Sequence, residues 1–139
     1  MSFSGIDEAG LNDLLDLIIP PDPQKGLPGA SQVGFQPDEE VWKILKILDD
    51  AAIVELDSRF HELSHPDRVT VVNSQRKSHP RLFSWVAKHV VTHYYQQQQV
   101  RRVLSLGESP PFPEGYSVEE GDLTLLEDVY FRGSIYRHV

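Results

Sequence analysis

The stretch LLDLIIPPDPQKGLPGA, Leu14 to Ala30, decides the fold of this chain. Its first half continues an apolar stripe with spacing i, i+3, i+4, i+7 and i+8, which predicts an amphipathic helix. The stripe consists of Leu11, Leu14, Leu15, Ile18 and Ile19. Ser4 and Asp7 have capping-box spacing ahead of it. Pro20 and Pro21 must end the helix, because proline has no backbone N–H and restricts the residue before it.

The segment that follows this helix is rich in proline and glycine. Residues 20–37 hold five prolines and three glycines in 18 residues. Such a segment is too stiff for a flexible linker and too rich in proline for a helix or a central strand. We therefore predict a structured surface loop over the core. A second proline-rich loop is expected at about 108–118, where the sequence reads SPPFPEGY.

The middle of the chain has helical periodicity in two segments. Residues 38–49 carry an apolar face, and Asp49 and Asp50 either cap a further helix or mark a bend in the first one. Ser64 predicts the start of another helix that runs to about Lys77. Its apolar side chains Val69 and Val72 are expected to point inward.

The strongest helical pattern begins near Ser78, which we expect to cap a central helix with Pro80 in its first turn. The apolar face of this helix consists of Leu82, Phe83, Val86, Val90 and Tyr94. Short helices are predicted around Val100 to Leu104 and at the closing LTLLEDVYF. The sequence thus predicts an all-α, compact helical bundle of about five to seven helices, in a single domain over residues 1–139.

Composition excludes several classes of function. There is no cysteine, so there is no disulfide framework, thiolate metal site or cysteine nucleophile. The net charge of −8 argues against nucleic-acid binding, which needs a concentrated basic face. Apolar runs such as 51–54 are far shorter than the roughly 20 residues that span a bilayer, so no membrane insertion is expected. MSFSGIDEAG is not a signal peptide, which predicts a cytoplasmic chain, or a periplasmic one if a partner co-exports it.

Few residues suggest catalysis or metal binding. His89 and His93 form an H-x-x-x-H pair at metal-ligand spacing, but the glutamate of H-E-x-x-H is missing and no third ligand can be identified. Two partly buried, hydrogen-bonded histidines explain the pair better. The sequence has no G-x-G-x-x-G and no Walker loop, so no cofactor is expected in this chain. We predict no catalytic residue.

Four aromatic residues near helix ends and loops are either core residues or part of an interface: Tyr94, Tyr95, Phe112 and Tyr116. The stiff loop with Pro28 and Gly29 likewise either covers the core or presents a preformed contact to a partner. Rigidity lowers the ordering cost of binding, and the two uses are compatible with each other.

The order of several short motifs resembles the small third subunit of bacterial gluconate 2-dehydrogenase and related flavoprotein dehydrogenases. These motifs are LLDLIIP, LPGASQVGF, FHELS, HYY, VLSLG and PPFPEGY, from Leu11 to Tyr116. The matching positions are Ile18 to Pro20, Pro28 to Ala30, Tyr94, Tyr95, Gly107, Gly115 and Tyr116. The family supplies no catalytic residues to carry over.

This resemblance implies a helical accessory subunit of an oxidoreductase complex. Its partner would be a large FAD-dependent dehydrogenase of the glucose-methanol-choline type, often beside a cytochrome subunit. The flavin belongs to the large subunit, and the small one assists its assembly, stability or export. Two alternatives remain open at this point: a metal-binding or hydrolytic protein that uses His89 and His93, and a self-contained homodimeric interaction protein.

Overall fold

The structure is a computed structural model that describes residues 5–107 and 121–133. Its contacts divide the chain into two units, residues 1–109 and 110–139. The described residues form six α-helices and three short 3-10 helices, and none of them belongs to a β-strand. The all-α prediction of five to seven helices is therefore confirmed.

The first helix of unit 1 is α1 (Gly5–Ile18), which ends just before the two prolines as predicted. Leu11, Leu14 and Leu15 of its apolar stripe are buried in the core. Ser4, the first residue of the predicted capping box, lies outside the described residues. After the loop comes α2 (Glu39–Leu56). Its N-cap is Asp38, whose carboxylate accepts a 3.1 Å hydrogen bond from the backbone N–H of Val41.

α2 continues as one helix through Asp49 and Asp50, so no further helix starts there. The C-cap of α2 is Asp57, whose φ of 50° lies in the left-handed region. Asp49 instead fixes the segment after α2: it accepts a 3.0 Å hydrogen bond from the N–H of Phe60 and forms a 2.7 Å ion pair with Arg59. This places the buried Phe60 in a 3-10 helix, η2 (Phe60–Glu62).

Ser64 is the N-cap of α3 (His65–Ser78), so the helix starts where it was predicted to start. Arg68 ties this helix to the preceding turn and to α1, because its guanidinium donates to the carbonyls of Phe60 and His61 and to the Asp13 carboxylate. Val71 is the fully buried residue of α3. Val69 and Val72, which were expected to point inward, are half-buried, and Val72 packs against the core. The helix is in contact with both α2 and α4.

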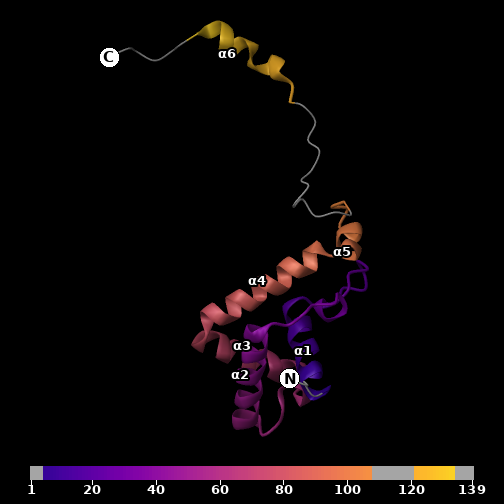
Figure 1. Cartoon of the computed structure of the whole chain (residues 1–139), viewed down its shortest axis with the longest axis vertical. Coiled ribbons are helices and arrows are strands. Elements are labelled where there is room, and N and C mark those ends of the chain that lie inside the picture. The colour runs from indigo at the N-terminus through magenta and orange to yellow at the C-terminus, as the bar shows by residue number, and fades with distance from the viewer. Residues whose placement is uncertain (1–4, 108–120, 134–139) are drawn as a thin grey trace, which may run out of the picture. The chain divides into compact units, whose positions relative to one another are not determined.

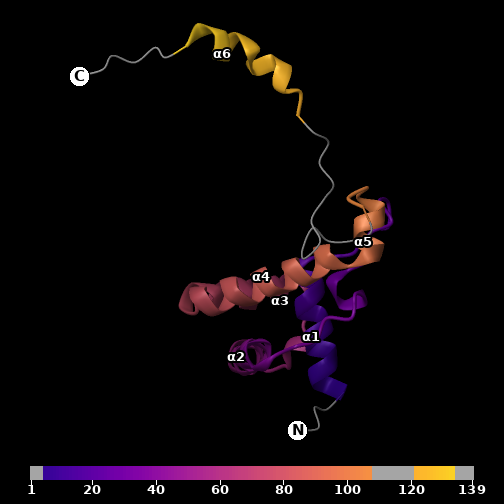
Figure 2. The ribbon, with the colours of Figure 1, turned by 45° about the horizontal axis from the view of Figure 1, so that its top comes forward.

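α4 (Pro80–Gln96) has the predicted buried face of Phe83, Val86, Val90 and Tyr94. The predicted cap is wrong: Ser78 is the last residue of α3, and His79 lies between the two helices and provides no side-chain cap. A short helix, α5 (Gln98–Val103), follows. Figure 1 shows α4 leading from α3 to α5, and Figure 2 shows α4 crossing α1, with which it is in contact.

The described part of unit 2 is a 3-10 helix, η3 (Leu123–Leu126), followed by α6 (Glu127–Arg132). Asp122 caps η3 by accepting a 3.0 Å hydrogen bond from the backbone N–H of Thr124. These two short elements correspond to the predicted closing helix. Across the ranges 5–107 and 121–133, no helix combines the length and the hydrophobicity needed to cross a membrane.

Candidate functional site

The proline-rich loop is folded back on itself. Asp22 and Leu27 exchange two backbone hydrogen bonds of 2.9 and 3.0 Å, which close a tight turn around Gly26. Gly26 has a φ of 68°, a conformation that glycine adopts without strain. The turn returns the chain to α1, where the N–H of Ala30 donates to the carbonyl of Ile19 over 2.9 Å. The predicted structured loop is confirmed.

Asp16 of α1 holds the second half of this loop. Its carboxylate accepts two hydrogen bonds from Ser31, one from the backbone N–H at 3.0 Å and one from the hydroxyl at 2.9 Å. Gly29 passes so close to Asp16 that a Cβ at this position would lie 2.5 Å from Oδ1. A side chain at this position would therefore force the Asp16 carboxylate, which is held by Ser31, to shift. Ala30 is completely buried and begins a 3-10 helix, η1 (Ala30–Gln32).

Tyr94 joins the loop to α4. Its hydroxyl donates a 2.7 Å hydrogen bond to the carbonyl of Pro28, and its side chain is only 2% exposed. Burial, with smaller contributions from Tyr95 and Asp22, raises the pKa of the Tyr94 phenol above its usual value. Of the two roles considered for Tyr94, its burial agrees with the core role, because the residue belongs to the core of this unit.

The other interface candidates differ in exposure. Tyr95 packs edge-on against Tyr94 with ring centroids 5.3 Å apart, yet it is 46% exposed. Pro28 is half-buried and Gly29 is buried, and they contact Tyr94 of α4 and Asp16 of α1, respectively. Phe112 and Tyr116 lie outside the described residues. Tyr95 is thus the one of these aromatic residues in the described ranges that offers a ring to a partner.

Arg101 is a structural residue that the sequence analysis missed. It is 5% exposed, and its guanidinium donates to three backbone carbonyls: Tyr95 at 3.4 Å, Leu106 at 2.8 Å and Gly107 at 3.1 Å. A buried arginine is tolerated when its donors are satisfied in this way. These bonds fix the end of α4 against the VLSLG segment. A dense Arg-Arg pair in an acidic chain was the available signal.

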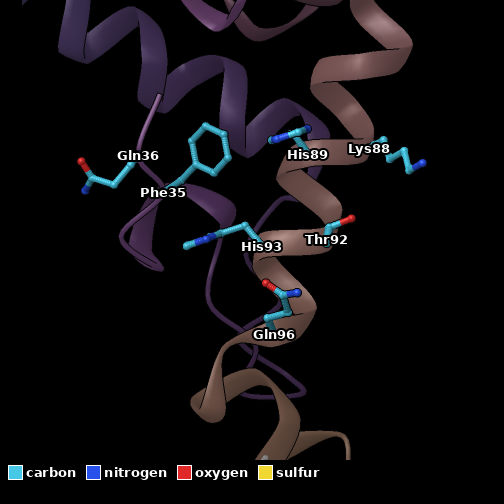
Figure 3. A pocket seen from close by; sticks show the side chains of 7 residues that line it. All are labelled: Phe35, Gln36, Lys88, His89, Thr92, His93 and Gln96. Atoms are coloured by element: carbon cyan, nitrogen blue, oxygen red, sulfur yellow. The ribbon is translucent and has the colours of Figure 1, made fainter. Parts of the chain in front are cut away.

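The two histidines of the H-x-x-x-H pair line an open cleft of about 430 Å³ between α4 and the end of the loop. Figure 3 shows both rings pointing from α4 toward Phe35, whereas Lys88 points away from it. The remaining lining residues are polar: Gln36, Thr92 and Gln96.

Each imidazole already has a structural contact. His93 Nε2 lies 3.0 Å from the carbonyl oxygen of Val33, which can only accept, so this nitrogen carries a proton and donates it. The Gln97 amide lies 3.3 Å from the same nitrogen, but its better bond is the 3.0 Å donation to the backbone carbonyl of His93. His93 also meets Phe35 edge-on, and His89 stacks on Trp85 with centroids 4.1 Å apart.

The cleft has the two predicted metal-ligand candidates but lacks a complete ligand set. Nowhere in the described residues do three or more His, Cys, Asp or Glu side chains gather as metal ligands would. The lone pair on Nδ1 is all that His93 retains for coordination when Nε2 donates to Val33. The prediction of a partly buried, hydrogen-bonded histidine thus fits His93, which fixes the loop to α4. His89 is exposed and stacks on Trp85 of its own helix.

Comparisons with protein-family models, with curated proteins and with solved structures gave no match. What the structure does supply is proximity. Segments from LLDLIIP, LPGASQVGF, HYY and VLSLG, far apart in the sequence, meet at one end of unit 1 through the hydrogen bonds of Asp16, Tyr94, His93 and Arg101. We call this region the motif end.

Proposed function

We propose that the chain is a non-catalytic accessory subunit that binds and stabilises a large FAD-dependent dehydrogenase subunit of the gluconate- or sugar-oxidising type. One observation carries the proposal: four of the six motifs on which the family resemblance rests form the hydrogen-bonded motif end. Their polar groups are used to build this end rather than to form an open reactive site. A structural role for the motifs is what an accessory subunit would need.

The surface beside the motif end supports protein binding. Five large apolar side chains on the second half of α4 and around α5 are between 37% and 46% exposed. They are Val91, Tyr95, Val103, Leu104 and Leu106, which we call the α4–α5 apolar residues. Exposed aromatic and aliphatic side chains held on a rigid support are typical of interface anchors. Arg101 supplies that support, because it bonds to the backbone of both Tyr95 and Leu106.

The proposed division of labour rests on the family resemblance. The chain has no dinucleotide fingerprint, so in this proposal the flavin and the oxidation chemistry belong to the large subunit, and a cytochrome subunit accepts electrons where one is present. The small subunit contributes by mass action, because a protein that binds the folded form of its partner stabilises that form.

Co-expression tests this proposal. The tagged chain is produced together with a candidate FAD-dependent dehydrogenase of this type, and flavin absorbance and band stoichiometry are measured after affinity purification. The double variant Tyr95→Ser/Leu106→Ser should bind at least about thirtyfold more weakly, since loss of a buried interface anchor costs roughly 2 kcal/mol or more. Val54→Ser is the matched control, because Val54 is an 85% exposed aliphatic residue on α2.

The outcomes separate clearly. Co-purified flavoprotein with the wild type and with Val54→Ser, but not with the double variant, supports the proposal. A wild-type chain that purifies alone from cells containing the soluble dehydrogenase contradicts it. Equal binding by all three proteins would place the interface elsewhere on the chain.

A further inference from the structure

A second pocket, of about 300 Å³, lies entirely within unit 1 among α1, α2, α3 and α4. Its floor consists of four buried core side chains: Leu14, Ile44, Phe83 and Val86. Its walls consist of five half-buried apolar side chains: Leu17, Ile18, Val69, Val72 and Ala87. The pocket therefore offers a continuous apolar surface from the core outward, unlike the polar cleft at His89 and His93.

The polar groups of this pocket are at its mouth. Asn73 and Arg76 line the pocket and are exposed. They lie on the same face of α3 as Val69 and Val72, because the four residues have the spacing i, i+3, i+4 and i+7. None of the described residues that line the pocket is an aspartate or a glutamate. No ion pair joins Arg76 to another residue of the described ranges. In a chain of net charge −8, this opening is locally cationic.

The pocket lies beside the core along α3. Val71 is fully buried in the core, whereas Val69 and Val72 are half-buried and line the pocket, and Val72 also packs against the core. Ligand pockets are typically apolar with a few polar groups that fix the orientation of the ligand, and their volumes run from roughly 300 to 1,000 Å³. A volume at the lower end of this range fits one unbranched alkyl chain and excludes a sterol or a two-chain lipid.

We propose that this pocket binds a short straight-chain carboxylate, with its alkyl chain against the α1, α3 and α4 walls and its carboxylate at Arg76 and Asn73. A guanidinium presents paired donors that match the two oxygens of a carboxylate, and the Asn73 amide adds a further donor. The alkyl chain supplies most of the affinity by leaving water, and the cation at the mouth selects the acidic head group. This site is independent of the proposed partner subunit.

Titration calorimetry of the purified full chain with butanoate, hexanoate and octanoate tests the apolar part. Each methylene that enters the pocket should strengthen binding about fourfold, because burial of one CH₂ is worth about 0.8 kcal/mol. The gain should stop once the chain is longer than the pocket. Octan-1-ol, which has the same chain without the charge, should bind about three- to fivefold more weakly than octanoate, the range expected for an exposed ion pair. Affinity that is independent of chain length, or no saturable binding, overturns the proposal.

Variants test the location. Ala87→Leu fills the pocket with a good helix former and should weaken octanoate binding more than tenfold while the far-ultraviolet circular dichroism is unchanged. Val72→Leu serves the same purpose from α3 if the first variant does not fold. Unchanged binding by a folded pocket-filling variant contradicts the site.

The head-group test uses a matched pair of arginines. Arg76→Gln should weaken octanoate binding about three- to fivefold and leave octan-1-ol binding unchanged, because it removes the charge and keeps the size of the mouth. Arg81→Gln, an exposed arginine on α4 that does not line the pocket, should change neither. Equal effects of the two substitutions show that Arg76 does not select the carboxylate and overturn the proposal.

Discussion

α4 and the η3–α6 segment carry similar apolar patterns but have opposite surroundings. On α4, Phe83, Val86, Val90 and Tyr94 are between 1% and 8% exposed. On η3 and α6, the side chains of Leu123, Leu126, Val129, Tyr130 and Phe131 are between 44% and 86% exposed. Periodicity thus predicts where a helix forms, but burial requires neighbouring elements with matching faces, and α4 has them in α1, α2 and α3.

The largest expected effect is on the buried side of this comparison. Phe83→Ala should lower the free energy of unfolding of unit 1 by about 3–5 kcal/mol, because it removes apolar contacts and leaves a cavity. Denaturant titration followed by circular dichroism measures the change. A loss below about 1 kcal/mol would show that α4 is not a core helix.

Arg101 tests whether the end of α4 depends on a buried polar group as well as on apolar contacts. Arg101→Met should cost about 2–3 kcal/mol, since hydrogen bonds from a charged donor are strong and three carbonyls lose their donor. Arg101→Lys should recover part of this loss, because lysine keeps a charged donor. The recovery should be incomplete, because one ammonium cannot reproduce the planar fork of a guanidinium. The same denaturant titration measures both variants. Equal stability of the methionine variant and the wild type would contradict the structural role.

Two glycines compare the crowded and the open parts of the chain. Gly29→Ala should cost about 1–3 kcal/mol, because its Cβ would lie 2.5 Å from Asp16 Oδ1 and 3.1 Å from Pro21 Cδ. Gly121→Ala should change the free energy of unfolding by less than about 0.5 kcal/mol, since nothing lies within 4 Å of its added Cβ. Thermal unfolding of both variants provides the measurement. Similar effects would remove the distinction.

Tyr94→Phe isolates the hydrogen bond between α4 and the loop and should cost about 1 kcal/mol at neutral pH. The folded pKa of this phenol is raised, mainly by burial, so its protonated form is favoured in the native state. The stability it contributes is complete below the unfolded pKa of about 10 and is lost as the pH rises through the folded pKa. Unfolding measured from neutral to strongly alkaline pH should therefore show the wild type losing its advantage over Tyr94→Phe. Parallel pH profiles would contradict the assignment.

The smallest effect is expected on α6. Phe131 is 86% exposed, so Phe131→Ala should change the free energy of unfolding by less than about 0.5 kcal/mol. Denaturant titration beside Phe83→Ala makes the comparison direct, since both substitutions remove the same side chain. A large loss for Phe131→Ala would show that this segment is buried in solution.

Much of the candidate site was readable as parts but not as an assembly. The sequence predicted the end of α1, the stiff loop, the cap at Ser64 and the apolar face of α4, because each depends on residues within one or two turns of each other. It did not predict that Asp16, Tyr94 and His93 all bond to the loop, since those bonds join residues 15 to 66 positions apart. The misplaced cap at Ser78 has a similar cause, because α3 continues through a residue that would otherwise start a helix.

By itself, the sequence determined the helical class, the end of the first helix before Pro20 and Pro21, and the lack of cysteine. The tertiary structure alone decided which aromatic residue is core and which is exposed: Tyr94 is buried under the carbonyl of Pro28, and its neighbour Tyr95 faces outward. It also decided that Gly29 packs closely against Asp16 and that Arg101 can be buried. The physical reason is that local pattern fixes backbone conformation, whereas burial and the pairing of polar groups depend on which distant segments come into contact.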